Sequence, residues 1–202
     1  MIDLLVATTN PGKFAEVKGF LAALPLRILS LKDLDHPPAV VEDGRTFEEN
    51  ALKKARTLAD FSGLLTLADD SGLEVDALDG APGIYSARYA GEDADDERNN
   101  DKLLDALAQV TTDRRTARFV CALALCAPPA PKKNDWVTRE SCEGRIAFEP
   151  RGANGFGYDP LFFFPPFGKT FGEIDQETKA TVSHRGKALK RLADALPQLI
   201  VG

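Results

Sequence analysis

Apolar positions near the start of the chain follow two different spacings. Residues 2–8 form a short apolar run, which predicts a strand. Between positions 14 and 24 apolar side chains recur every three or four residues, which predicts an amphipathic helix. Thr46 and Glu49 have the spacing of a helix capping box, so a second helix is predicted from Thr46 to about Asp60. This alternation of strand and helix is typical of an α/β fold.

The middle of the chain continues the alternation. Strands are predicted at about 64–68 and 73–77, separated by a polar turn at 69–72. A turn-rich segment at 79–83 follows, and then an acidic helix at about 93–109. The leucines predicted to form the buried stripe of that helix are Leu103, Leu104 and Leu107.

The last part of the chain predicts a long antiparallel hairpin. Its strands, at about 116–127 and 136–148, flank a proline-rich loop at 127–131. A short strand at 162–164 and a final helix at 185–196 follow, with Leu189, Leu192 and Leu196 of that helix facing inward. We therefore expect a mixed α/β architecture in which the first half and the hairpin half form two lobes around a cleft.

Composition narrows the class of protein. Of the 202 residues, 44% are hydrophobic and 28% are charged, as in an ordinary globular protein. No apolar stretch is long enough for a membrane span, and no basic region precedes the first apolar run, so we expect a cytoplasmic protein without a membrane partner. The net charge of −6 argues against a partner that is a nucleic acid polymer.

The three cysteines are not predicted to form a site. Cys121 and Cys126 are five residues apart on one predicted strand, and this odd separation places them on opposite faces. Cys142 stands alone. We expect reduced thiols that pack as small hydrophobic side chains.

The most informative segment is Asp69-Asp70-Ser71-Gly72, directly after the apolar run 64–68. Open α/β sheets bind ligands at the carboxyl ends of their strands, where this segment is predicted to lie. Two adjacent carboxylates either hold a cation such as Mg²⁺ or divide general-base and structural duties. A simple Asx-turn that caps the strand is the structural alternative.

Two other segments suggest phosphate binding. Thr8 to Lys13 joins the first strand to the first helix, and backbone N–H groups at a helix N-terminus favour an anion beside the Lys13 ammonium. Thr46, Asn50 and Lys54 are spaced to share one face of the second helix, behind the acidic turn 42–44. An exposed lysine and a solvated helix face are the respective structural alternatives.

A glycine-rich segment at 152–157 does not match the dinucleotide-binding fingerprint and precedes a strand. Phe156, flanked by glycines, suits stacking on a planar base. The neighbouring pair Ser183-His184 does not indicate a serine hydrolase, because adjacent side chains diverge on a helix and no third member is apparent.

Six sequence blocks, in order along nearly the whole chain, resemble the Ham1 or inosine triphosphatase-like family of non-canonical purine nucleoside triphosphate pyrophosphatases, also called dITP/XTP diphosphatases. The blocks are Thr8–Lys13, Thr46–Ala51, Ala68–Leu73, Ala81–Tyr89, Gly155–Pro160 and Ser183–Gly186. The resemblance implies one α/β domain over residues 1–202, with a mixed sheet in two lobes and a central substrate cleft. It also implies an Mg²⁺-dependent homodimer that hydrolyses ITP, dITP and XTP between the α- and β-phosphates. The products would be a nucleoside monophosphate and pyrophosphate, which removes these nucleotides from the pool.

The resemblance also assigns residue roles. Asp70 matches the catalytic proton acceptor, and Glu42 and Asp70 match the residues that hold Mg²⁺. The residues that match substrate contacts are Thr8, Thr9, Asn10, Pro11, Gly12, Lys13, Lys54, Ser71, Phe156, Gly157, Tyr158, Asp159, Lys179, His184 and Arg185.

This chain departs from the family pattern in two places. Thr9 replaces a residue that is often small or an amide. The acidic turn reads Val41-Glu42-Asp43-Gly44 where Glu-Glu-Thr-Gly is common, so Asp43, like Asp69, is a further candidate for metal binding. A nucleotide-binding regulatory module without turnover and a binder of single-stranded nucleic acid are the other functions considered, and the net charge disfavours the second.

Overall fold

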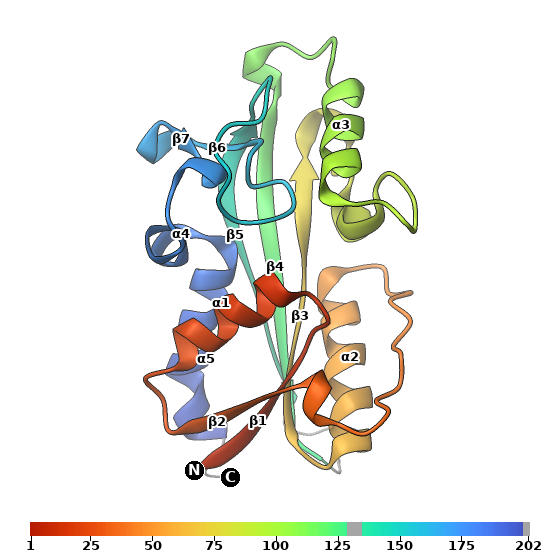
Figure 1. Ribbon diagram of the computed structural model, residues 1–202, viewed down its shortest axis with the longest axis vertical. Coiled ribbons are helices and arrows are strands. Elements are labelled where there is room, and N and C mark those ends of the chain that lie inside the picture. The colour runs from red at the N-terminus through yellow and green to blue at the C-terminus, as the bar shows by residue number, and fades with distance from the viewer. Residues whose placement is uncertain (129–134, 200–202) are drawn as a thin grey trace. The chain divides into compact units, whose positions relative to one another are not determined.

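The computed structural model describes residues 1–128 and 135–199, and Figure 1 shows a mixed sheet with helices. The sheet has seven strands in the order β2-β1-β3-β4-β5-β6-β7. The strands are β1 (Ile2–Ala7), β2 (Leu26–Ser30), β3 (Leu65–Val75), β4 (Thr116–Cys126), β5 (Trp136–Ile146), β6 (Phe162–Phe164) and β7 (Lys169–Thr170). The α-helices are α1 (Pro11–Leu21), α2 (Phe47–Ser62), α3 (Asp96–Ala106), α4 (Gln176–Val182) and α5 (His184–Leu199).

The chain forms two compact units. Unit 1 comprises residues 1–70, 121–140 and 185–202, and unit 2 comprises 71–120 and 141–184. The strands β3, β4 and β5 each contribute residues to both units. The mixed α/β fold predicted from the sequence is confirmed.

In unit 1, β1 pairs in parallel with both β2 and β3, with Leu4 opposite Ile28 on one side and Leu65 on the other. Parallel neighbours need a crossover connection, which α1 and α2 provide. One core cluster joins apolar side chains of β1, β3, β4, α1 and α5, including the predicted inward leucines of the last helix. That cluster contains Leu4, Val6, Val17, Leu21, Leu67, Leu123, Leu189, Leu192 and Leu196.

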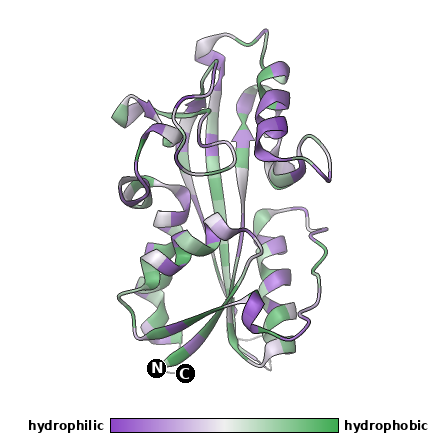
Figure 2. Ribbon diagram, in the orientation of Figure 1, coloured by the Kyte–Doolittle hydropathy of each residue, from purple (hydrophilic) through white to green (hydrophobic). Residues whose placement is uncertain are grey.

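Unit 2 has a second core, in which aromatic side chains pack among aliphatic ones. β5, β6 and β7 are antiparallel neighbours, and the ring centroids of Phe119 and Phe162 lie 4.5 Å apart. Figure 2 shows α3 as mostly hydrophilic, yet Leu103 is fully buried and Leu107, at its C-terminal cap, is buried too. The predicted stripe of α3 is therefore confirmed, although Leu104 is only partly buried.

The turn predicted at 69–72 is wrong, because β3 continues without interruption from Leu65 to Val75. The acidic segment thus lies within a strand and not after one. Gly72 is needed for close approach: a Cβ there would lie 2.3 Å from the Oγ of Ser86. The strand β2 and the helix α4 were not predicted, since each is short and lacks a clear period.

Other predicted elements differ from the structure mainly at their ends. The acidic helix begins at Asp96, because the side chain of Asp95 caps it. β4 and β5 are hydrogen-bonded neighbours, as the hairpin requires. Residues 129–131 of the proline-rich loop lie outside the described residues. Within the described residues, no helix has the length and apolar character needed to cross a bilayer.

Candidate active site

The loop between β1 and α1 is shaped by its own polar side chains. The Asn10 Oδ1 atom accepts a hydrogen bond from the Lys13 backbone N–H at 3.0 Å, which caps α1. The Thr8 Oγ1 atom accepts from the Asn10 N–H at 3.2 Å, and Pro11 occupies the first turn. The first turn of α1 contains no acidic residue, so its N–H groups and the Lys13 ammonium form a positive end.

Asp69 joins Lys13 and Arg185 in a buried ionic network. Its carboxylate lies 2.6 Å from the Lys13 Nζ and accepts from the Arg185 Nε at 2.8 Å. Arg185 also pairs with Glu16 of α1. Burial by itself would raise the pKa of Asp69, but the charges of Arg185 and Lys13 outweigh it and hold this pKa well below its usual value. Asp69 is therefore a permanent carboxylate and a poor general base.

Asp70 has different partners because successive side chains of a strand point to opposite faces. Lys54 of α2 lies 3.7 Å from Asp70 and 2.9 Å from Glu42. The Oδ2 atom of Asp70 is buried and has no hydrogen-bond partner within the described residues. Burial raises the pKa of Asp70 to about 6, with Glu42 raising it and the charges of Lys54 and Lys13 opposing the rise.

The acidic turn is tied to α2 by a buried asparagine. The Oδ1 atom of Asn50 accepts from the Gly44 N–H at 2.8 Å, and Thr46 caps the helix by accepting from the Glu49 N–H at 3.1 Å. Of the three residues on the predicted phosphate-binding face, Thr46 and Asn50 thus bind backbone groups, and only Lys54 carries a charge that could attract a phosphate. In a capping box, the Glu49 carboxylate would accept from the Thr46 N–H. Here it accepts from the Arg45 N–H instead.

These groups fit a hard cation. Mg²⁺ usually takes one or two protein carboxylates, with the remaining positions filled by water and substrate oxygens. Glu42 and Asp70, with the unpartnered buried Oδ2 atom, form such a set. No group of three or more potential ligands from His, Cys, Asp and Glu is present in the described part of the chain, so an all-protein cage is not formed there. Asp43 is exposed and pairs with Lys53 at 2.6 Å, and Asp69 is committed to Lys13 and Arg185.

In unit 2, Lys179 and Asp159 form a buried ion pair beside Phe156. Their Nζ and Oδ2 atoms are 2.6 Å apart, and the same Oδ2 accepts from the Phe156 N–H at 2.9 Å. The Lys179 ammonium also lies 4.9 Å from the centroid of the Phe156 ring. The structure thus brings together an aromatic face, an ammonium and a carboxylate, and the predicted nucleoside contacts at these three residues stay a prediction.

The segment that carries Phe156 depends on two glycines in left-handed conformations. Gly155 has φ +77° and Gly157 has φ +60°. A Cβ on Gly155 would lie 2.0 Å from the Oδ2 atom of Asp159, so a side chain there would displace the ion pair. Tyr158 is buried, its hydroxyl donates to the Ser86 carbonyl at 2.8 Å, and burial raises its pKa. Tyr158 therefore supports this segment from within unit 2.

The remaining predicted residues occupy different surroundings. Ser71 lies in β3, directly after Asp70. His184 is buried in unit 2, where its ring stacks on Phe119 with centroids 4.7 Å apart. Arg185 lies in unit 1 with its guanidinium on Asp69 and Glu16. The sequence analysis did not identify Glu16. Its spacing from Lys13, about one turn along α1, could have indicated it.

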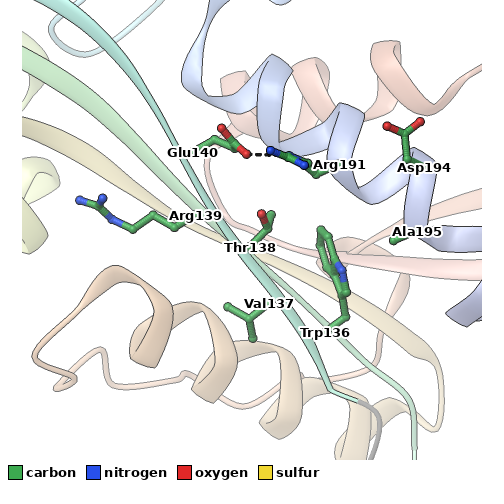
Figure 3. A pocket seen from close by; sticks show the side chains of 8 residues that line it. All are labelled: Trp136, Val137, Thr138, Arg139, Glu140, Arg191, Asp194 and Ala195. Carbon is green, nitrogen blue, oxygen red and sulfur yellow. Dashed lines mark hydrogen bonds and ion pairs between the residues drawn. The ribbon is translucent and has the colours of Figure 1, made fainter.

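A surface pocket in unit 1 is distinct from these clusters. It has a volume of about 580 Å³ and lies between β5 and α5, as Figure 3 shows. Its two arginines already bind carboxylates: Arg191 lies 2.9 Å from Glu140, and Arg139 lies 3.6 Å from Glu48. None of the predicted site residues lines it.

Comparisons with known proteins identify the family of this chain. The model of the Ham1 family matches residues 4–195. The chain is 53% identical over 196 residues to a dITP/XTP pyrophosphatase of Geobacter sulfurreducens, with 97% of each chain covered. It is 52% identical to a dITP/XTP pyrophosphatase of Exiguobacterium sibiricum, covering 96% of this chain and 97% of the relative.

Solved structures give the same result for the fold. The HAM1 protein of Coxiella burnetii has a TM-score of 0.87 and 41% identity, covering 98% of this chain and all of the other. The Ham1 protein of Staphylococcus aureus has a TM-score of 0.85 and 39% identity, with 97% and 98% covered. With its whole length matched in sequence and in fold, this chain belongs to the Ham1 family.

Proposed function

We propose that this protein hydrolyses non-canonical purine nucleoside triphosphates (ITP, dITP and XTP) between the α- and β-phosphates. The products are the nucleoside monophosphate and pyrophosphate. The observation that carries the proposal is the set Glu42, Lys54 and Asp70, in which a buried carboxylate oxygen has no partner in the described residues. The names of the relatives at about half identity support the same substrate class.

The positive groups of unit 1 suit a polyphosphate. The N-terminus of α1, with Lys13 in its first turn, binds phosphate oxygens without reading the base. Lys54 neutralises charge that develops on the phosphates during bond cleavage. The net charge of −6 makes these local cations necessary, because the protein as a whole repels a triphosphate.

Asp70 is the proposed general base. A carboxyl whose pKa is raised to about 6 by burial is ionised at neutral pH and accepts a proton from the attacking water more readily than an ordinary aspartate does. Glu42 and Asp70 would hold Mg²⁺, which supplies positive charge to the phosphate oxygens when bound. Ionised Asp69 keeps Lys13 in place and takes no part in proton transfer.

The nucleoside is proposed to bind to unit 2. The Phe156 ring provides a stacking face for the base, and the Lys179–Asp159 pair provides a donor and an acceptor beside it. Ser71 and His184 remain predicted contacts on the strength of the family resemblance. The homodimer and the cytoplasmic location also remain predictions.

Product analysis tests this proposal. The wild-type protein is incubated with ITP and Mg²⁺, and pyrophosphate, orthophosphate and nucleotides are separated by ion-exchange chromatography. We expect IMP and pyrophosphate in equal amounts, and no turnover after chelation of the metal with EDTA. Orthophosphate and IDP as products would overturn the proposal. Tight ITP binding without any product would instead identify a regulatory module.

A further inference from the structure

Two side chains near the start of α3 bind the backbone N–H and carbonyl groups of Gly157. The Asp96 Oδ2 atom accepts from the Gly157 N–H at 2.7 Å, and the Asn100 Nδ2 group donates to the Gly157 carbonyl at 3.1 Å. Asp96 and Asn100 are four residues apart, so they share one face of the helix. Both backbone polar groups of Gly157 are therefore bound by side chains that lie one helical turn apart on α3.

The same helix also holds the segment against which Tyr158 rests. Asn99 donates to the Ala87 carbonyl at 3.2 Å and accepts from the Ala90 N–H at 2.8 Å. The neighbouring Ser86 carbonyl accepts from the Tyr158 hydroxyl. Two consecutive residues, Gly157 and Tyr158, are thus fixed either directly by α3 or through a segment bound to it.

Burial shows that these asparagines do not form a solvated face. Asn99 is 3% exposed and Asn100 is 8% exposed, although the sequence of α3 is acidic and polar. The Asn100 Oδ1 atom is buried and has no partner within the described residues. Burial of a polar atom without a hydrogen-bond partner lowers stability. Asn100 therefore binds Gly157 at the cost of leaving its own Oδ1 atom unsatisfied.

We propose that Asp96 and Asn100 are positioning residues that set the base selectivity of the Phe156–Asp159 segment. This inference rests on the proposed function. Neither side chain has to contact the substrate. Two hydrogen bonds join Phe156 to Asp159, one from the Phe156 N–H to the Asp159 carboxylate and one from the Asp159 N–H to the Phe156 carbonyl. Glycine at φ +60° has wide conformational freedom, so without the bonds from α3 rotation about Gly157 would loosen this turn and the position of the Phe156 ring within it. Discrimination between bases requires polar groups at fixed positions, because a mobile group adapts to the wrong base.

The test compares Asp96→Ala with the matched control Glu97→Ala. Both variants remove a carboxylate from the first turn of α3, and hence the same favourable interaction with the helix dipole. Glu97, however, is exposed and has no recorded bond to the Phe156–Asp159 segment. Asn100→Ala is paired in the same way with the exposed Asp101→Ala. Thermal unfolding of each variant establishes that it is folded.

For Asp96→Ala we expect KM for ITP to rise about 10-fold and the ITP/ATP ratio of kcat/KM to fall by a similar factor, as loss of one charge-assisted hydrogen bond predicts. For Asn100→Ala, which loses a neutral hydrogen bond, we expect changes in the same direction that are smaller. Inhibition by pyrophosphate, which lacks a base, should not change. Asp96→Asn keeps an acceptor and should restore most of the selectivity. The two control variants should match the wild type.

Equal losses for ITP and ATP, or selectivity in Asp96→Ala and Asn100→Ala equal to that of their controls, would overturn the inference. If Asp96→Ala does not fold, Asn100→Ser tests the bonds to Gly157 from their other side, with the results expected of Asn100→Ala and the same contrary results. Failure of the wild type to hydrolyse ITP would contradict the proposed function instead, so the two claims fail separately.

Discussion

Two adjacent aspartates of β3 have opposite electrostatic surroundings. Asp69 points toward Lys13 and Arg185, which keep it ionised, whereas Asp70 is buried beside Lys54 and has a raised pKa. Strand geometry separates them, since consecutive side chains lie on opposite faces. One carboxylate is therefore suited to hold cationic side chains, and the other to accept a proton and hold a metal ion.

Neutralising the two aspartates should have different consequences. Asp70→Asn should lower kcat for ITP by at least about 10²-fold, as loss of a general base predicts, while thermal stability is kept. Asp69→Asn should lower the free energy of unfolding by about 3 kcal/mol, because partly buried Lys13 and buried Arg185 both lose a carboxylate partner, although Arg185 keeps another, Glu16. Urea denaturation and steady-state kinetics of both variants check this. Similar stability losses in the two variants would contradict the separation.

At the level of elements, α2 carries two neighbouring lysines with different environments. The Lys54 side chain is 11% exposed and lies between Glu42 and Asp70, whereas the Lys53 side chain is 41% exposed and pairs with exposed Asp43. The helical turn points Lys54 toward β3, and Asn50 on the same face anchors the acidic turn. The α2 residues in the proposed site thus lie on one face of the helix.

This difference provides a matched pair of variants. Lys54→Ala should lower kcat/KM for ITP by about 10²-fold, as removal of one group that stabilises transition-state charge predicts. Lys53→Ala loses only an exposed ion pair and should stay within about twofold of wild type, since such pairs contribute little. Steady-state kinetics with saturating Mg²⁺ measure both. Equal effects at the two positions would refute the assignment of Lys54.

The elements also show what could be predicted from the sequence. The spacing of apolar residues correctly predicted α1 and α5, and the capping box at Thr46 correctly predicted α2. The same reasoning misjudged Gly72 as a turn residue, since close contact with Ser86 leaves no trace in local sequence. It also expected α3 to be a polar helix with its leucines as the buried stripe. The bonds of α3 to Gly157 could not be predicted, because they join residues 57 and 61 positions apart.

For the molecule as a whole, the three cysteines are buried and none of them forms a disulfide within the described residues. Burial, together with nearby Asp135, raises the pKa of Cys126 to about 12, and burial raises the pKa of Cys121 well above its usual value. These findings confirm that the thiols are buried, although Cys121 also donates a hydrogen bond to the Asp69 carboxylate at 3.2 Å. A raised thiol pKa stabilises the fold below the unfolded value of about 8.5, and this contribution is lost as pH rises toward the folded value.

Thiol labelling tests this description. At pH 8 the native protein should react with Ellman's reagent at a rate limited by unfolding, whereas all three thiols should react at once in guanidinium chloride. The free energy of unfolding should also decrease as pH rises from about 8.5 toward 12. Rapid labelling of any thiol in the native protein at pH 8 would show that the cysteines are more accessible than the structure indicates.

The central claim is that this Ham1 family member selects its substrates by the base. In the proposed nucleoside site, the Lys179 ammonium lies beside Phe156. We propose that it donates to the 6-oxo group of hypoxanthine and xanthine, and that the 6-amino group of adenine leaves it unmatched. Guanine shares the 6-oxo group, so we expect adenine to be rejected more strongly than guanine.

The most direct test is kcat/KM for ITP, XTP, GTP and ATP with Mg²⁺, measured as pyrophosphate release by the wild-type protein. We predict values for ITP and XTP at least about 10²-fold above the value for ATP, as expected of a site whose polar groups are left unpaired by the wrong base. Comparable values for ITP and ATP would contradict the account.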